Sequence, residues 1–203
     1  MAANSVLTNE ARDSKSPLAA KVKEQIDVMR DQVNLYLDRA RRAARAQTIG
    51  SSTDVEPVLQ SLARTLQRIN RDRNLAIEVN APATLRFRGE RQDLEEMVGN
   101  VMDNACKWAK SKIKVTAKLM PISSEPGRTW FVISVEDDGP GIAAENRAEA
   151  LKRGQRLDES KPGSGLDMSI ILETTSMYAG KVELADSALG GLLFNLQLPS
   201  VGP

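Results

Sequence analysis

Residues 135–142 read Val-Glu-Asp-Asp-Gly-Pro-Gly-Ile, and they follow a stretch, Trp130–Val135, whose alternating residues predict a β-strand. A carboxylate, Asp137, therefore stands at a strand end, in front of Gly139 and Gly141. Glycine lets the backbone approach a bound group closely and adopt positive φ where that is needed. The same pattern also occurs in ordinary turns, so its meaning depends on the residues that accompany it.

A predicted helix upstream, residues 93–110, carries three polar residues of interest. Asn100, Asn104 and Lys107 are spaced i, i+4 and i+7, so they share one face of the helix. Amide oxygens are hard ligands that suit Mg²⁺, and a lysine ammonium group can meet a phosphate as a point charge. These residues are either part of a nucleotide site or the solvated face of an ordinary helix.

A second glycine pair lies downstream, where residues 163–166 read Gly-Ser-Gly-Leu. The segment 139–163 before it is rich in glycine and charge and poor in apolar residues, which is typical of a functional or mobile loop. Arg156 and Lys161 in this segment are candidate phosphate contacts, and the alternative is plain surface charge. The Gly-Lys-Ser/Thr pattern of a Walker A loop is absent.

The remaining patterns indicate alternating helices and short strands. We predict helices over 54–71, 93–110 and 167–177, and strands over 75–79, 84–87, 113–119, 130–135, 181–185 and 192–198. Helices on one side of a largely antiparallel sheet make an α+β fold, a two-layer sandwich.

The N-terminal part has a different pattern. Residues 17–46 lack Gly and Pro and repeat apolar residues every seven positions, which indicates a long helix packed against another helix. The natural interpretation is a helical hairpin or a dimer bundle, and the alternative is a long amphipathic helix on the globular domain. Gly50 opens a linker-like stretch, so we assign residues 1–49 and 50–203 to separate domains.

Composition excludes several functions. The 28 Lys and Arg residues against 27 Asp and Glu leave a net charge of +1, which gives no reason to expect a nucleic-acid partner. Cys106 is the single cysteine and there is no histidine, so disulfides within the chain, zinc–histidine sites and Ser-His-Asp triads are excluded. No apolar run approaches the ~18 residues of a membrane span, so we expect membrane attachment only through upstream segments.

Residues 54–198 resemble the ATP-binding domain of the GHKL superfamily (gyrase, Hsp90, histidine kinase, MutL), and most of all that of PhoQ-type sensor kinases. The resemblance rests on residues 99–107, 135–142 and 153–156 taken in that order. Residues 5–48 resemble the end of the dimerisation hairpin that precedes this domain. The resemblance implies a Bergerat-type ATP-binding fold, ATP or ADP as ligand and Mg²⁺ as cofactor.

The resemblance also implies roles for single residues. Asp137 would accept a hydrogen bond from the exocyclic amine of adenine, and Ile142 would line the adenine slot. Asn104 would bind Mg²⁺, with Asn100 beside the γ-phosphate and Lys107 on phosphate. The other implied nucleotide contacts are Gly139, Gly141, Trp108, Arg156, Lys161, Gly163, Ser164, Gly165 and Leu166, of which Arg156 and Lys161 belong to a lid over the phosphates.

Asp167 departs from the family pattern, because the second glycine box usually has a glycine at its position. An anion there either weakens triphosphate binding by repulsion or simply caps the helix that follows, since Asp is favoured at an N-cap. Both interpretations stay open at this point.

The chain also lacks the acceptor histidine, which in the family lies on the first hairpin helix. Either the sequence given starts beyond that residue or the protein naturally lacks it, and we favour the first. We expect the catalytic part of a sensor kinase that acts in the cytoplasm, forms homodimers through its hairpin and phosphorylates a response regulator. The alternatives are a catalytically impaired kinase-like module and, disfavoured by the heptad helix, an anti-sigma-type serine kinase.

Overall fold

The computed structural model describes residues 51–120, 129–151 and 166–201. Contacts divide the chain into two units, Met1–Ile49 and Gly50–Pro203, and every described residue belongs to the second. The helical hairpin assigned to residues 1–49 therefore lies outside the described residues and stays a prediction.

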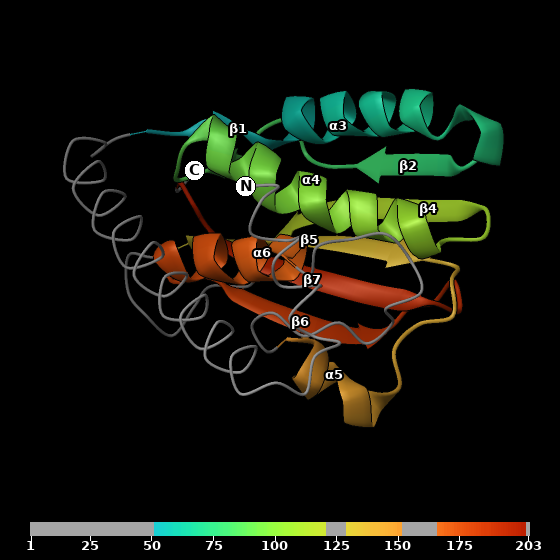
Figure 1. Cartoon of the computed structure of the whole chain (residues 1–203). Helices are drawn as coiled ribbons and strands as arrows, with labels where there is room; N and C mark the ends of the chain where they lie inside the picture. Colours follow the sequence, from blue (N-terminus) through green and yellow to red (C-terminus); the bar gives the residue numbers. More distant parts are fainter. Residues whose placement is uncertain (1–50, 121–128, 152–165, 202–203) are drawn as a thin grey trace, which may run out of the picture. The chain divides into compact units, whose positions relative to one another are not determined.

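A seven-stranded sheet forms one layer of the second unit (Figure 1). Its strands are β1 (Thr53–Asp54), β2 (Ala76–Asn80), β3 (Arg86–Phe87), β4 (Lys112–Leu119), β5 (Thr129–Asp137), β6 (Lys181–Asp186) and β7 (Leu192–Ser200). The order is β1-β3-β7-β5-β4-β2, and β6 also pairs with β7. All pairs are antiparallel except β2 with β4, which confirms the predicted, largely antiparallel sheet.

Helices form the second layer. They are α3 (Val55–Ile69), α4 (Arg91–Trp108) and α6 (Leu166–Met177), with α4 in contact with both of the others. Figure 1 shows these three on one face of the sheet, which confirms the predicted two-layer α+β sandwich. A 3₁₀ helix, η1 (Arg71–Arg73), and a short helix, α5 (Ala144–Ala150), complete the elements. Helix α5 was not predicted, because its seven residues are mostly polar and too few to show a helical period.

The core lies between the two layers and follows from the periodicity of each element. Helix α3 buries Val55, Val58 and Leu59, which recur at the spacing of one helix face. Strands β4 and β5 bury alternate residues, as expected for a sheet that has one covered face. The core is mainly aliphatic, as the low aromatic content predicts, and Phe87 packs edge-on against Phe131 with ring centres 6.3 Å apart.

This topology brings three chain segments together at one point. Strand β5 lies between β4 and β7, and its last residue, Asp137, pairs with Ile113 of β4. On the other side Gly191 donates its N–H to the Asp137 carbonyl oxygen at 3.1 Å, just before β7 begins. The C-terminal end of α4 reaches the same place, since the Trp108 carbonyl borders Gly139. None of the described helices has the length and apolar character needed to cross a bilayer.

Candidate functional site

Asp137 is the buried carboxylate at the C-terminal end of β5, with 4% of the residue exposed. Its Oδ1 accepts hydrogen bonds from the backbone N–H of Gly139 at 2.8 Å and of Leu192 at 3.3 Å. Within the described residues its Oδ2 accepts none. Two backbone donors thus fix the orientation of the carboxylate and leave one oxygen for a further donor.

Burial raises the pKa of Asp137 above its ordinary value. The hydrogen bonds from Gly139 and Leu192 act in the opposite direction, and the negative charge of Asp138 adds to the increase. A buried acid with a raised pKa, one oxygen of which accepts no hydrogen bond from the part of the chain that the structure describes, is typical of a functional site rather than of a turn.

Three glycines surround this carboxylate because side chains would not fit there. A Cβ on Gly191 would lie 2.2 Å from Asp137 Oδ1, and one on Gly139 would lie 2.7 Å from the Trp108 carbonyl oxygen. Gly141 has a φ of +70°, which side-chain-bearing residues rarely adopt. Our sequence analysis predicted Gly139 and Gly141 as site residues and missed Gly191. The Gly190-Gly191 pair before the last strand was the available signal.

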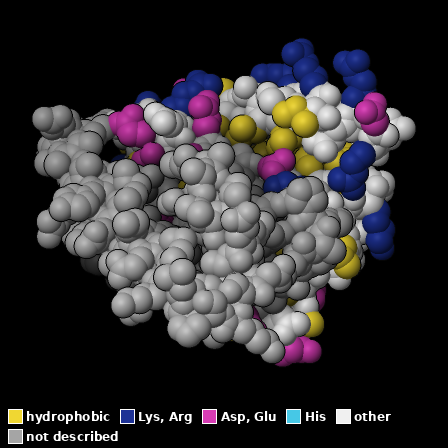
Figure 2. All heavy atoms as spheres, viewed as in Figure 1, with side chains coloured by type: hydrophobic (Ala, Val, Ile, Leu, Met, Phe, Trp, Pro, Cys, Tyr) yellow, Lys and Arg dark blue, Asp and Glu magenta, His cyan; other side chains and the backbone are white. Residues whose placement is uncertain are grey.

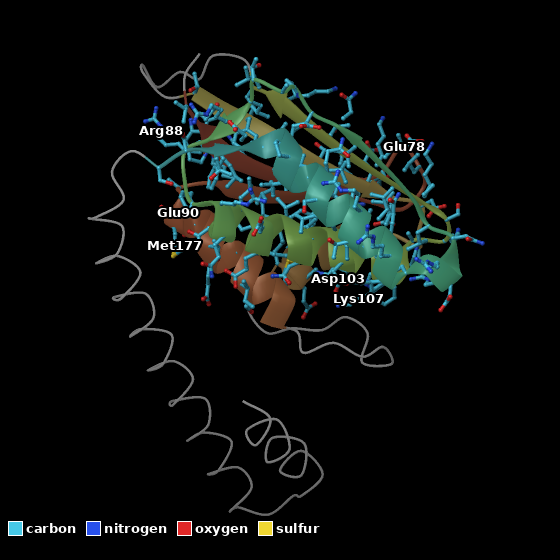
Figure 3. All side chains as sticks on the ribbon, turned by 90° about the horizontal axis from the view of Figure 1, so that it is seen from above. Glu78, Arg88, Glu90, Asp103, Lys107 and Met177 are labelled. Atoms are coloured by element: carbon cyan, nitrogen blue, oxygen red, sulfur yellow. The ribbon has the colours of Figure 1, made fainter. Side chains whose placement is uncertain are left out.

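Helix α4 presents the predicted polar residues. Asn100, Asn104 and Lys107 are all half-buried, and Trp108 is half-buried at the end of the same helix. Lys107 forms an ion pair with Asp103, with Nζ and Oδ2 2.8 Å apart, and Figure 3 shows the two next to each other near the end of α4. Such an i, i+4 surface pair contributes only about 0.3–0.5 kcal/mol, so Lys107 can readily exchange Asp103 for another anion.

The loop after β5 is anchored by Arg147 of α5. Its Nε donates to the Ile142 carbonyl oxygen at 3.0 Å, and its Nη2 pairs with Asp186 of β6. The Ile142 side chain packs, half-buried, against the core. Sequence reasoning missed Arg147, because its partner in β6 is 39 positions away.

The second glycine box falls mostly outside the described residues. Arg156, Lys161, Gly163, Ser164 and Gly165 are not described, so their roles in a lid stay predictions. Helix α6 is described over Leu166–Met177, and the residues just before it lie outside the described residues. The two interpretations of Asp167, repulsion of the triphosphate and capping of this helix, therefore stay predictions.

The described residues contain no group of three or more His, Cys, Asp or Glu side chains arranged to hold a metal ion. The predicted donors for a divalent cation are amide oxygens, to which oxygens of the ligand itself would add. This donor set suits Mg²⁺, which keeps several waters and binds through few protein groups together with phosphates. Asn100 and Asn104 supply such amides on one face of α4.

Comparisons with known proteins agree with the geometry. The family model described as histidine kinase-, DNA gyrase B-, and HSP90-like ATPase matches residues 89–202. The chain is 35% identical over 195 residues to the sensor protein kinase CarS of Pseudomonas aeruginosa, covering 96% of this chain and 42% of CarS. It is 32% identical over 168 residues to the sensor protein PhoQ of Escherichia coli, covering 83% of this chain and 33% of PhoQ. The chain thus spans less than half the length of either relative.

Solved structures show the same fold. The mycobacterial sensor histidine kinase MprB is 30% identical with a TM-score of 0.58, and the match covers 75% of this chain and all of that one. The catalytic domain of the histidine kinase ThkA has a TM-score of 0.61 at 18% identity, over 73% of this chain and 94% of that one, and shows the fold alone. The chain belongs to the family of histidine kinase-, DNA gyrase B- and HSP90-like ATPases, and it carries the ATP-binding catalytic domain of a sensor histidine kinase.

Proposed function

We propose that the site around Asp137 binds ATP or ADP together with Mg²⁺ and positions the γ-phosphoryl group for transfer to a histidine that this chain does not contain. The observation that carries the proposal is the Asp137 carboxylate, which is buried and held through Oδ1 by two backbone N–H groups, while no described residue donates to Oδ2. A carboxylate that is oriented in this way matches a ligand that donates a hydrogen bond to its second oxygen.

Adenine supplies that donor. Its exocyclic amine can donate to Asp137 Oδ2, whereas guanine has a carbonyl oxygen at the same position and would be repelled. The glycines at 139, 141 and 191 leave space for a flat base close to the backbone. Ile142 adds an apolar surface for the ring, as the family resemblance implies.

Helix α4 provides the residues that bind the phosphate groups of the nucleotide and the magnesium ion. Asn104 holds the magnesium ion and Asn100 lies beside it and the γ-phosphate, while Lys107 moves from Asp103 to a phosphate oxygen. Trp108 covers the nucleotide. When bound, Mg²⁺ neutralises charge that develops on the phosphates, which is the main requirement in phosphoryl transfer. The lid residues Arg156 and Lys161 contact the phosphates, and Gly163, Ser164, Gly165 and Leu166 of the second glycine box are further contacts of the nucleotide.

The reaction replaces one phosphorus bond by another. The bond between the γ-phosphorus and its bridging oxygen breaks, ADP leaves, and a phosphorus–nitrogen bond forms to the histidine imidazole. The aspartate of a response regulator then receives the phosphoryl group. Relatives named as sensor proteins support this pathway, a homodimer formed through the helical hairpin, and a position in the cytosolic part of a membrane sensor.

Calorimetry with ADP, ATP, GDP and GTP tests the nucleotide site. We expect the adenine nucleotides to bind at least tenfold more tightly than the guanine nucleotides, and Asp137→Asn to remove most of that preference. Unchanged binding in Asp137→Asn would refute the assignment of Asp137 to adenine.

A second candidate is a kinase-like module that binds nucleotide and signals by protein contacts without phosphoryl transfer. It is favoured by Asp167, which stands where the family pattern has a glycine in the phosphate-binding box. Adding a hairpin fragment that bears the acceptor histidine of a sensor kinase, together with γ-labelled ATP, separates the two. Acid-labile label on the hairpin supports the kinase, whereas no transfer despite measured ATP binding supports the module.

A further inference from the structure

The C-terminal end of α4 is capped by a residue from a distant part of the chain. The guanidinium group of Arg73, in η1, donates through Nη1 to the Cys106 carbonyl and through Nη2 to the Ala109 carbonyl at 2.6 Å. Its Nη1 also lies 3.5 Å from the Lys107 carbonyl oxygen. The last carbonyls of a helix have no partner within the helix, and a cation is favourable there because of the helix dipole. Arg73 therefore fixes the end of α4.

Arg73 differs in this respect from the other cations around it. Lys and Arg side chains gather on the surface over α3 and β2 (Figure 2), and Arg68, Arg71 and Arg73 are all exposed. The side-chain hydrogen bonds to the end of α4 come from Arg73, whereas Arg71 makes none within the described residues. Arg71 is thus a matched control, with the same charge in the same short helix.

A second residue, Asp138, holds the segment that follows α4. Its Oδ1 accepts from the N–H of Lys110 at 2.8 Å and of Ser111 at 3.0 Å, and its Oδ2 accepts from the Ser111 hydroxyl at 2.7 Å. The Asp138 N–H in turn donates to the Lys112 carbonyl at 3.3 Å. These bonds join the first residue after β5 to the turn between α4 and β4.

The two sets of contacts meet at the candidate nucleotide site. Asp138 lies between Asp137 and Gly139, and Gly139 abuts the Trp108 carbonyl with no room for a side chain. On α4, Lys107 is itself one of the residues whose carbonyl faces Arg73. Arg73 thus binds the C-terminal end of α4, and Asp138 binds the turn that follows it, next to Asp137.

We propose that Arg73 and Asp138 are positioning residues of the nucleotide site. They hold the Asn104 and Lys107 face of α4 in register with Asp137, so that the base and the magnesium–phosphate group of one nucleotide are bound together. Neither residue contacts the nucleotide. The inference rests on the proposed function, because it takes Asp137 as the adenine contact and α4 as the phosphate contact.

The test uses the full chain and measures separately how the base and the magnesium–phosphate group contribute to ADP affinity. The dissociation constant of ADP is measured with excess Mg²⁺ and with a chelator, and the ratio of the two gives the gain in affinity from magnesium. We expect Arg73→Gln and Asp138→Asn to reduce this gain about tenfold, because small misplacements of binding groups have effects of that order or larger. Binding without magnesium should change by less than about twofold, since the adenine contact is kept.

The controls are Arg71→Gln and Asp72→Asn, which change charge in η1 without touching α4. Both should keep the magnesium gain of the parent chain. Arg73→Lys keeps the charge but loses the planar arrangement of donors, so we expect an intermediate gain, and this variant also serves if Arg73→Gln does not fold.

Two failures can be told apart. If Asp137→Asn binds ADP like the parent chain, the proposed nucleotide site is wrong, and the inference fails with it. If Asp137→Asn loses binding but Arg73→Gln, Arg73→Lys and Asp138→Asn keep the full magnesium gain, the proposed function stands and the positioning role is refuted. Equal weakening with and without magnesium would also refute the role, since that is the effect of a general loss of stability.

Discussion

The Asp137 carboxylate destabilises the empty domain, because burial raises its pKa above the ordinary value of 3.8. When an acid has a higher pKa in the folded state than in the unfolded state, the protein loses stability as the pH rises from the unfolded-state pKa to the folded-state pKa. The full cost is therefore present above the folded-state pKa, where the group is ionised in both states. A ligand that donates to Oδ2 compensates for that cost, so function and stability oppose each other at this residue.

We predict that Asp137→Asn stabilises the nucleotide-free chain at pH 7 while it weakens adenine binding. Each kcal/mol gained would raise the melting temperature by about 2–4 °C in a domain of this size. The gain should disappear below pH 3.8, where aspartate is protonated in both states. Thermal unfolding monitored by circular dichroism measures it, and a lower melting temperature at pH 7 would contradict the prediction.

The same substitution at the next residue is the matched control. Desolvation alone would raise the pKa of Asp138, but hydrogen bonds from Ser111, Lys112 and Lys110 lower it below the ordinary 3.8. Its contribution to stability is present above that pH and is lost as pH falls further. Asp138→Asn should therefore lower the melting temperature at pH 7, opposite in sign to Asp137→Asn.

The glycines allow a second prediction at this scale. Gly191→Ala would place a Cβ 2.2 Å from Asp137 Oδ1 and 2.5 Å from the Gly139 nitrogen, so we expect a loss of about 2–4 kcal/mol in stability and no measurable ADP binding. Gly99→Ala, in the interior of α4, meets only a Leu62 methyl at 3.6 Å. It should stabilise the chain by about 0.5–1 kcal/mol and leave ADP affinity unchanged. Denaturant unfolding and calorimetry of both variants check this contrast.

The sequence predicted candidate site residues only where the pattern is local. Asp137, Gly139 and Gly141 stand in one short motif, and Asn100, Asn104 and Lys107 share one helix face, so spacing marked them as candidates and the family resemblance implied their roles. Gly191, Arg73 and Asp138 act through contacts with residues 27 to 54 positions away. Nothing in a single sequence specifies which distant backbone groups those residues will meet.

Among the elements, α5 connects the glycine loop to the edge of the sheet. Arg147 donates to the Ile142 carbonyl at 3.0 Å and pairs with Asp186, of which 86% of the side chain is exposed, while 18% of the Arg147 side chain is. A surface ion pair of this kind contributes little, whereas the hydrogen bond to the loop holds the residue next to Gly141 in place.

We therefore predict that substitution of Arg147 weakens ADP binding more than substitution of Asp186 does. Arg147→Met should weaken ADP binding about three- to tenfold, because the loop loses its donor, and Asp186→Asn should change it by less than about twofold. Calorimetry with Mg²⁺–ADP measures both. Equal effects would mean that the ion pair itself, and not the bond to Ile142, positions the loop.

The predicted elements differ from the observed ones mainly where turns or strand pairing, which the local residue pattern does not specify, decide the structure. The strand predicted over 84–87 shortens to Arg86–Phe87, because Leu85 donates its N–H back to Pro82 in a turn. The parallel pairing of β2 with β4 is not visible from alternation, which gives only the two faces of a strand. The long apolar periods of α3 and α4 were sufficient to predict both helices to within a few residues.

At the scale of the whole molecule, the described core is self-contained in the second unit. Its buried apolar residues run from Val55 to Leu198, and β1 and β7 join the two ends of that unit through β3. The candidate site residues that the structure describes also belong to it, from Arg73 to Leu192. Under the proposed function, the second unit by itself therefore contains the described part of the nucleotide site.

We predict that a fragment of residues 50–203 unfolds in one cooperative transition and binds Mg²⁺–ADP within about twofold of the full chain. The physical reason is that every contact invoked for the site and its support is made inside that fragment. Calorimetry on the fragment and the full chain gives the comparison, and Asp137→Asn in the fragment controls for binding elsewhere. A fragment that folds but binds more than tenfold weaker would show that residues 50–203 do not form the complete nucleotide site.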